Sequence, residues 1–361
     1  MTRELELISS VTQFAPNRVN PDATRVAKAS AAAEADGYDT VLVGYNSNRP
    51  EGFGIANEVF RSTSKLRVLL AHRPGMMSPS LAARTISTLD VFSGGRLSIN
   101  VVTGGSAIDQ HREGDYADHD QRYERSIEYM DVLRQCWTQE EAFDFEGRFY
   151  KVENVRHDLQ PLQKPYVPLY MGGSSDMAMV LAERHADVFM SWSEPVAAVA
   201  SRFEEVRGRL AGAGKTDPGL SVSMRLVFGD TEDEAWDAAY SIVSNDDAEA
   251  SAAKRKFHAQ DVGRNRQLQF AKEGLVHDER LWMGIAALTG GLGSTGALVG
   301  TAEQVTESLL AYVRAGANAL LLTGPDGAYC PFPDGFLANL RVRANEVLAE
   351  SAAHDGVGQP A

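Results

Sequence analysis

The strongest constraint on the fold is a regular alternation along almost the whole chain. Short runs of β-branched apolar residues are followed by longer amphipathic stretches. Strands that alternate with helices pair in parallel, because each helix carries the chain back to the start of the next strand. Strands are expected at Leu5–Ser10, Thr40–Gly44, Leu66–Ala71, Leu97–Val102, Val167–Met171, Val188–Ser191, Ser221–Phe228 and Ala319–Leu322. The pattern therefore predicts an α/β fold, a (β/α)8 TIM barrel built from these eight strands.

Helices are predicted for the amphipathic stretches Ala23–Ala35, Ser80–Phe92, Tyr123–Trp137, Met177–His185, Pro195–Ala213 and Thr301–Ala315. Two of their starts carry capping signals. Thr301 with Gln304 three residues later forms a capping box, in which each side chain accepts a backbone N–H of the other residue. Asp22 can cap the first helix through its side-chain oxygen.

The chain is expected to form a single domain over residues 1–350, with a flexible tail at 351–361. One connection, about 245–299 between the seventh and eighth strands, is too long for a simple turn. It holds several basic residues and ends in glycines at 290, 291 and 293. Because it leaves the carboxyl face of the barrel, it is predicted to be a lid. The alternative is a set of extra helices on the barrel rim.

The composition limits the classes of partner and the cellular location that are expected for this chain. The formal net charge of −14 disfavours nucleic acid and anionic membranes, which attract basic surfaces. The cysteines, Cys136 and Cys330, stand outside any CxxC or histidine cluster, so neither a disulfide framework nor a metal site is expected. No secretory signal and no apolar stretch of membrane-spanning length are evident, and a cytoplasmic location is expected.

Two glycine-rich strand ends are candidate ligand sites. Asn100 and Thr103 lie near the end of the fourth strand, where they could hydrogen-bond a planar heterocycle beside Gly104 and Gly105. The segment Gly173-Ser174-Ser175 follows another strand and opens a helix, which suits a phosphate group. The simpler alternatives are a tight strand exit and ordinary N-capping. Neither a GxGxxG after the first strand nor a P-loop motif is present.

A third segment, His119 to Arg125, enters a helix. Arg122 could bind a phosphate through two N–H groups, and Tyr123 could stack or hydrogen-bond nearby. The alternative is that this segment is only the charged first turn of a helix, with no bound ligand, since such a turn would contain the same residue types.

Taken in order, these segments resemble the luciferase-like, FMN-dependent monooxygenases, and among them the alkanesulfonate monooxygenase branch. The resemblance also includes His72-Arg-Pro-Gly75, Thr88 to Arg96, Ser191-Trp192 and Ala297 to Thr301. It implies that Asn100 lies beside the isoalloxazine ring and that Thr103 follows on the same turn. Asp109 matches a position that the pyrimidine-ring-opening branch fills with a flavin-contacting Glu. Arg122, Tyr123 and Ser174, with Gly173 and Ser175, match the phosphate site.

The substrate pocket departs from the alkanesulfonate pattern. Arg225 matches that branch's arginine on the seventh strand, but Val227 stands where its histidine would be. The branch's cysteine is replaced near Asn48–Arg49, its lid arginine by Thr289 and its C-terminal tyrosine by Pro325. Arg225 and Arg49 could still bind an anionic substrate.

The resemblance implies a two-component monooxygenase. Reduced FMN would come from a separate NAD(P)H-dependent flavin reductase, and oxygen would serve to desulfonate an alkanesulfonate to an aldehyde and sulfite. Arg225 would bind substrate and act in catalysis, and His72 would act as acid or base, although a lone histidine at a strand end is often structural. Relatives of this kind are homodimers or homotetramers.

Four alternatives remain open at this stage. The enzyme could oxidise a sulfone, a chelator, a thiophene or a nitrogen heterocycle instead. It could be a deazaflavin-dependent oxidoreductase, which would consume no oxygen. It could be a non-catalytic flavin-binding barrel, or a barrel without any flavin.

Overall fold

The computed structural model describes residues 4–11, 21–215, 217–244, 262–291 and 295–357. The chain forms two compact units. The first, here the N-unit, comprises residues 11–31 and 40–189. The second, the C-unit, comprises residues 1–10, 32–39 and 190–361. Helix α1 (Ala23–Asp36) has residues in both.

The N-unit is built on a parallel sheet with the order β2-β3-β4-β7. These strands are β2 (Thr40–Val43), β3 (Arg67–His72), β4 (Leu97–Val101) and β7 (Leu169–Gly172). Asn100 lies opposite Ala71 of β3 and Tyr170 of β7. Residues 68–71 are buried without alternation, as expected for a parallel strand covered on both faces. The helices of the unit are α2 (Gly52–Ser62), α3 (Pro79–Ser93), α4 (Ala107–Arg112), α5 (His119–Thr138) and α6 (Asp176–His185).

Local chemistry accounts for the ends of α2 and α3. Ser78 caps α3 by accepting the amide N–H of Leu81, and Gly94 ends it in the left-handed conformation. Arg96 then donates to the carbonyl of Phe60 in the last turn of α2 and to that of Leu66, just before β3. The Gly-Gly-Arg motif therefore ends one helix and caps the preceding one.

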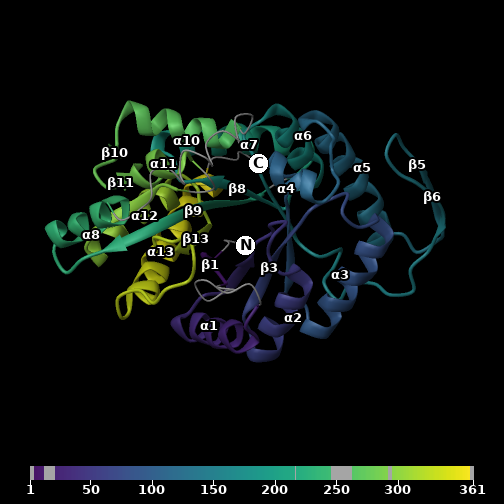
Figure 1. Ribbon diagram of the computed structural model, residues 1–361, viewed down its shortest axis with the longest axis horizontal. Coiled ribbons are helices and arrows are strands. Elements are labelled where there is room, and N and C mark those ends of the chain that lie inside the picture. Colours follow the sequence, from purple (N-terminus) through teal and green to yellow (C-terminus); the bar gives the residue numbers. More distant parts are fainter. Residues whose placement is uncertain (1–3, 12–20, 216, 245–261, 292–294, 358–361) are drawn as a thin grey trace. The chain divides into compact units, whose positions relative to one another are not determined.

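A two-stranded hairpin, absent from the sequence prediction, projects beyond α5 (Figure 1). Its strands are β5 (Phe143–Glu146) and β6 (Lys151–Val155). Glu128 of α5 accepts the amide N–H groups of Arg148, Phe149 and Tyr150 at 2.9, 2.8 and 3.2 Å. The hairpin was missed because its apolar residues are only half-buried and both strands are short.

The C-unit contains a parallel set with the order β12-β9-β13-β1. Its strands are β1 (Glu6–Ser10), β9 (Gly219–Phe228), β12 (Ala297–Gly300) and β13 (Ala319–Thr323). Strand β8 (Val188–Trp192) enters this unit at Met190 and also pairs with β9. Its main helices are α7 (Val196–Gly212), α8 (Glu232–Ser244), α12 (Ala302–Arg314) and α13 (Phe336–Val357). The capping box predicted at Thr301 is confirmed, as is the cap at Asp22, which accepts the Arg25 amide.

The predicted lid lies partly outside the described residues, at 245–261 and 292–294. The rest of that connection forms α10 (Val262–Glu273), the hairpin β10 (Val276–His277) and β11 (Leu281–Trp282), α11 (Gly284–Thr289), and β12. Arg266 makes a two-pronged ion pair with Glu194, and the amide of Gln267 donates to the carbonyl of Ser193. Helix α10 is therefore held against the segment after β8. For the described residues of this connection, the structure agrees with the alternative of extra helices on the barrel rim. The lid itself stays a prediction.

The expected tail begins later than predicted, because α13 continues through residue 351 to Val357. The alanines in this stretch have high helix propensity, so the helix gains from continuing there. Residues 358–361 lie outside the described residues.

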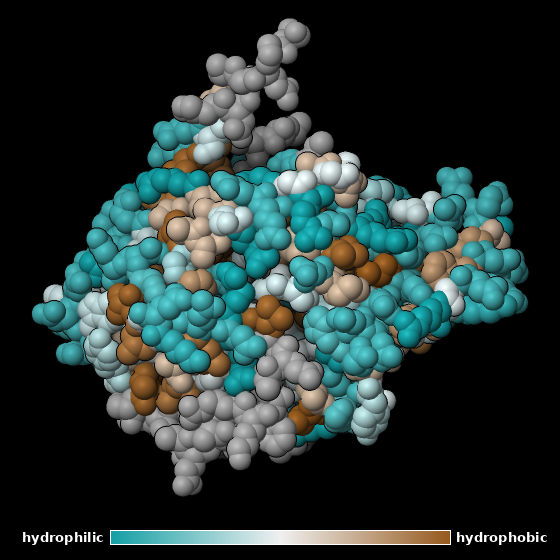
Figure 2. All heavy atoms as spheres, turned by 90° about the horizontal axis from the view of Figure 1, so that it is seen from above, coloured by the Kyte–Doolittle hydropathy of each residue, from teal (hydrophilic) through white to brown (hydrophobic). Residues whose placement is uncertain are grey.

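The surface drawn in Figure 2 is mainly hydrophilic, with hydrophobic side chains in small separate groups. The most exposed large hydrophobic residues are Phe92 and Tyr116. No helix in the described part of the chain combines the length and the apolar character needed to span a bilayer.

Candidate functional site

The polar segments of the N-unit gather where its parallel strands end. Since the carboxyl ends of parallel strands share one edge of the sheet, the segments that follow them come close together. Tyr45 to Arg49 follow β2, Arg73 to Gly75 follow β3, and Gly173 to Ser175 follow β7. The longest segment, 102–118, follows β4 and includes α4.

The turn after β7 is shaped for close packing. Gly173 has φ +145°, and a Cβ there would lie 2.5 Å from the Cβ of Ala178 and 3.3 Å from the hydroxyl of Tyr123. Tyr123 of α5 therefore lies against this turn, and only glycine fits at position 173. The Oγ of Ser175 accepts the amide N–H of Ala178 and caps α6, so the N-capping alternative holds for Ser175. Its hydroxyl hydrogen is still available for donation.

Three half-buried polar side chains on this edge, those of Asn100, Thr103 and Ser174, make no hydrogen bond to the residues that the structure describes. Asn100 occupies the same strand face as buried Ser98, and Thr103 follows the end of β4. Their donor and acceptor groups are therefore not used within the described part of the chain and are available to contact a ligand.

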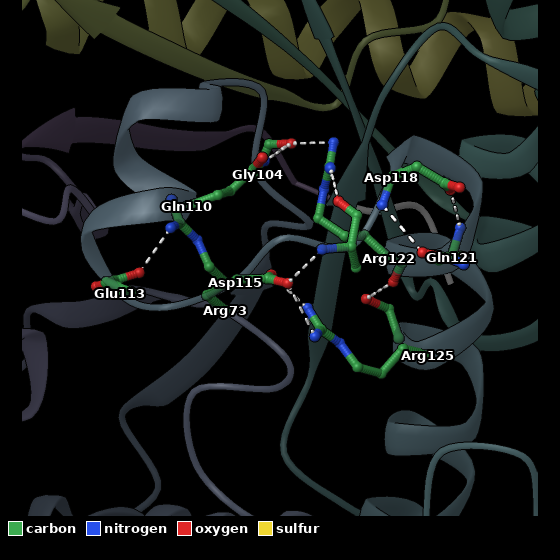
Figure 3. Close-up of polar contacts among 11 residues, drawn as sticks. Arg73, Gly104, Gln110, Glu113, Asp115, Asp118, Gln121, Arg122 and Arg125 are labelled. Carbon is green, nitrogen blue, oxygen red and sulfur yellow. Dashed lines mark hydrogen bonds and ion pairs between the residues drawn. The ribbon is translucent and has the colours of Figure 1, made fainter.

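Arg122 of α5 is hydrogen-bonded to the segment that follows β4. Its terminal nitrogens donate to the carbonyl of Ala117 at 2.7 Å and to that of Gly104 at 3.3 Å (Figure 3). Burial lowers the pKa of its guanidinium. Gln110 donates to the same Gly104 carbonyl at 2.9 Å. Gly104 has φ +93°, and a Cβ there would lie 2.7 Å from the amide nitrogen of Gln110. Arg122 thus holds the 102–118 segment, and its Nε has no partner among the described residues, so its role at a phosphate stays a prediction.

Asp109, on α4, accepts a hydrogen bond from the hydroxyl of Ser47 at 2.5 Å. Arg112, one turn later, lies 3.8 Å from the same carboxylate. Arg49, in the segment after β2, is exposed, and its backbone N–H donates to the carbonyl of Asn46.

His72, the last residue of β3, is buried. Its Nε2 lies 2.7 Å from the hydroxyl of Tyr129, and Phe53 packs edge-on against the ring. Burial lowers the pKa of His72 to about 4 and raises that of Tyr129. At neutral pH the imidazole is therefore neutral, and it shares one hydrogen bond with the Tyr129 hydroxyl. This arrangement favours the structural alternative for His72.

Arg225 belongs to the C-unit, on β9, opposite Thr323 of β13. Its Nη1 donates to the carbonyl of Pro325 at 2.5 Å. Burial lowers the pKa of the guanidinium, and the nearby Asp326 opposes that shift. Arg225 is thus a half-buried cation within β9, level with the last residue of β13.

Several residues of the N-unit site escaped prediction. They are Tyr45, Arg73, Glu113, Asp115 and Arg125, which form two ion-pair networks around the 102–118 segment. Arg73 and Arg125 lie within recognised motifs, but their partners are distant in the sequence. Within the described residues, no cluster of three or more His, Cys, Asp or Glu side chains suits a metal ion.

This donor set fits a flavin mononucleotide. The serine hydroxyls and the first-turn amides of α6 suit a phosphate, and the Asn100 amide with the Thr103 hydroxyl suits the polar edge of a heterocycle.

Comparison with known proteins supports the fold and the family. The chain is similar to EDTA monooxygenase from Chelativorans sp. BNC1, with 18% identity and a TM-score of 0.73 over 97% of this chain and 95% of that one. It is also similar to the oxygenating constituent of 3,6-diketocamphane monooxygenase from Pseudomonas putida, solved with FMN, with 18% identity and a TM-score of 0.67 over 97% and 99%. An F420-dependent secondary alcohol dehydrogenase matches with 17% identity and a TM-score of 0.68 over 95% and 99%.

These matches confirm the predicted (β/α)8 barrel. The model of the luciferase-like monooxygenase family matches residues 5–319, and the chain therefore belongs to that family.

Proposed function

We propose that this protein is the oxygenase of a two-component system that takes reduced FMN from a separate flavin reductase and uses oxygen to oxidise a small organic molecule. The observation that carries the proposal is the set of Asn100, Thr103 and Ser174, half-buried and without hydrogen bonds to the described residues, on the strand-end edge of the N-unit. Family membership supports it.

In this proposal Gly173, Ser174 and Ser175 hold the phosphate with the first-turn amides of α6, and Tyr123 lies beside them. Asn100 and Thr103 hydrogen-bond the ring, and Asp109 faces it from α4. The flavin, when bound, supplies the activation of oxygen. Arg122 contributes by fixing the 102–118 segment through the Gly104 and Ala117 carbonyls.

We further propose an alkanesulfonate as substrate, with Arg225 as the residue that binds it and Arg49 as a second candidate. A guanidinium offers paired N–H groups that match sulfonate oxygens. The balanced reaction consumes the sulfonate, one O₂ and one reduced FMN, and it yields an aldehyde, hydrogensulfite, oxidised FMN and water. His72 remains a candidate for proton transfer only as a neutral imidazole.

Three further proposals go with this function. The protein acts as a homodimer or homotetramer, its flavin comes from an NAD(P)H-dependent reductase, and it works in the cytoplasm. The location is supported by Cys136 and Cys330, which are both free thiols.

The first experiment is an anaerobic titration of the purified protein with reduced FMN, oxidised FMN and reduced F420. Reduced FMN should bind most tightly, and mixing with oxygen should give oxygen consumption coupled to a substrate. A panel of alkanesulfonates, sulfones and chelating amines, read out as sulfite or aldehyde, then identifies the substrate class.

Each outcome is informative. Preferential binding of F420 with hydride transfer would replace the proposal by a deazaflavin oxidoreductase. FMN binding with oxygen consumption no faster than free flavin gives would indicate a flavin-binding protein without this activity. Oxidation of a sulfone or a chelator, but no sulfite from any sulfonate, would overturn the sulfonate assignment alone.

A further inference from the structure

Arg73 and Gly75 of the motif His72-Arg-Pro-Gly75 have no part in the proposed chemistry, yet the Arg73 side chain is buried against Glu113 of the 102–118 segment. Arg73 is 4% exposed, and its Nη1 lies 2.7 Å from an oxygen of Glu113 (Figure 3). Tyr45 donates its hydroxyl to the other oxygen of Glu113 at 2.5 Å. The guanidinium of Arg73 also lies over the Tyr45 ring, 4.4 Å from its centre.

These three residues form a closed triangle. Tyr45 follows β2, Arg73 follows β3 and Glu113 follows α4, so the triangle ties the end of α4 to two strand ends. A buried arginine needs its carboxylate, because an unpaired charge in this position is strongly destabilising. The end of α4 therefore has one strongly preferred position.

A second tie lies on the other side of the same segment. Arg125 of α5 donates to both oxygens of Asp115 at 3.2 and 2.6 Å. Burial raises the pKa of Asp115, but the hydrogen bonds from Arg125 and the Ala117 amide outweigh it, so the net pKa is lowered. Asp115 thus stays ionised and paired.

Gly75 makes room for this second tie. It has φ +98°, and a Cβ there would lie 2.7 Å from the guanidinium carbon of Arg125. An arginine with a free end could move aside, but this one is held by both oxygens of Asp115. A side chain at position 75 would therefore weaken the Arg125–Asp115 pair.

We infer that Arg73 and Gly75 are positioning residues that hold the 102–118 segment, and with it Thr103 and Asp109, in its flavin-binding conformation before the flavin arrives. The consequence for flavin binding rests on the proposed function, whereas the consequence for the segment's own order does not. A preordered segment binds its ligand more tightly, because less conformational freedom is lost on binding.

The test uses two pairs of matched variants of the full chain. Tyr45→Phe removes one hydrogen bond of the triangle and keeps the ring under Arg73, while Tyr116→Phe alters an exposed tyrosine of the same segment. Gly75→Ala disturbs Arg125, while Gly37→Ala, outside the segment, places a Cβ at a matching positive φ of +99° with nothing within 4 Å.

Two quantities are measured: backbone hydrogen exchange of residues 102–118 without flavin, and the Kd for FMN by flavin fluorescence. Tyr45→Phe and Gly75→Ala should each speed exchange and raise the Kd by about fivefold to tenfold, an effect comparable to the net contribution of one ordinary hydrogen bond. The two control variants should match the wild type in both quantities, and exchange in the core strands should stay unchanged in all four.

If each variant and its control behave alike in exchange, the inference is wrong. If the segment loosens but the Kd for FMN is unchanged, the positioning role is wrong, although the tie exists. If the wild type binds no FMN, the proposed function fails, and the exchange data still decide whether the motif orders the segment.

Discussion

A single buried ionisable side chain can make the stability of this protein depend on pH. His72 illustrates the point, because burial lowers its pKa to about 4 from the ordinary value near 6.5. Between those two pH values the unfolded chain binds a proton that the folded chain does not, so folding becomes less favourable as the pH falls.

We therefore predict that the protein loses up to about 3 kcal/mol of stability from this one residue between pH 6.5 and pH 4. The full contribution is present above pH 6.5. Unfolding midpoints at a series of pH values measure it, with His72→Gln compared against the wild type. Replacing the exposed His111 by Gln serves as the control. An identical pH dependence in the wild type and His72→Gln would contradict the burial argument.

Gly173 is the residue where shape matters most. We predict that Gly173→Ala lowers stability by about 1–3 kcal/mol through its positive φ and steric overlap. It should also weaken FMN binding, because the new Cβ would displace Ala178 and the start of α6. Thermal unfolding and FMN titration measure the two effects. Gly214→Ala, at φ +79° with nothing within 4 Å, is the control for backbone strain alone. Equal FMN affinity in both variants would argue against this turn as the phosphate site.

At the scale of secondary-structure elements, a single side chain can hold a short hairpin against a helix. The hairpin β5–β6 depends on Glu128, which accepts three backbone N–H groups of its turn. We predict that Glu128→Ala speeds hydrogen exchange of residues 147–152 by at least about tenfold while FMN binding is unchanged. Glu124→Ala, which removes only an exposed ion pair with the Arg148 side chain, should have little effect. Similar exchange in both variants would show that the hairpin is held by other contacts.

Helix α6 offers a second test at this scale, because its N-cap lies in the proposed phosphate site. We predict that Ser175→Ala costs about 1 kcal/mol of stability through loss of the cap to Ala178. Ser174→Ala should leave stability nearly unchanged and weaken FMN binding, since Ser174 has no hydrogen-bond partner among the described residues. Thermal unfolding with and without FMN separates the two roles. If Ser174→Ala binds FMN as the wild type does, Ser174 is not a phosphate ligand.

At the scale of the whole molecule, ligand binding and folding are linked. A ligand that binds only the folded state at a hundred times its Kd adds about 2.7 kcal/mol to stability. We predict that FMN raises the unfolding temperature in a concentration-dependent way, and that riboflavin, which lacks the phosphate, raises it less. Differential scanning calorimetry at several ligand concentrations measures both. An equal effect of riboflavin and FMN would contradict a phosphate site at Gly173 to Ser175.

The order of strands and helices was predictable because it follows from local patterns. The eight barrel strands were located by their apolar β-branched runs, and Thr301 and Asp22 marked helix starts through their own side chains. The hairpin β5–β6 and the strands β10 to β12 were missed. Each of these strands has only two to five residues, so periodicity is a weak signal there.

By itself, then, the sequence determined the fold class, the family and the strand ends at which polar residues collect. Only the tertiary structure decided that Arg122 holds the Gly104 and Ala117 carbonyls, that Arg73 pairs with Glu113, and that Gly75 accommodates Arg125. The reason is physical. Secondary structure and capping depend on neighbours within a few residues, whereas the pairing of a buried charge depends on which distant segment the fold places beside it.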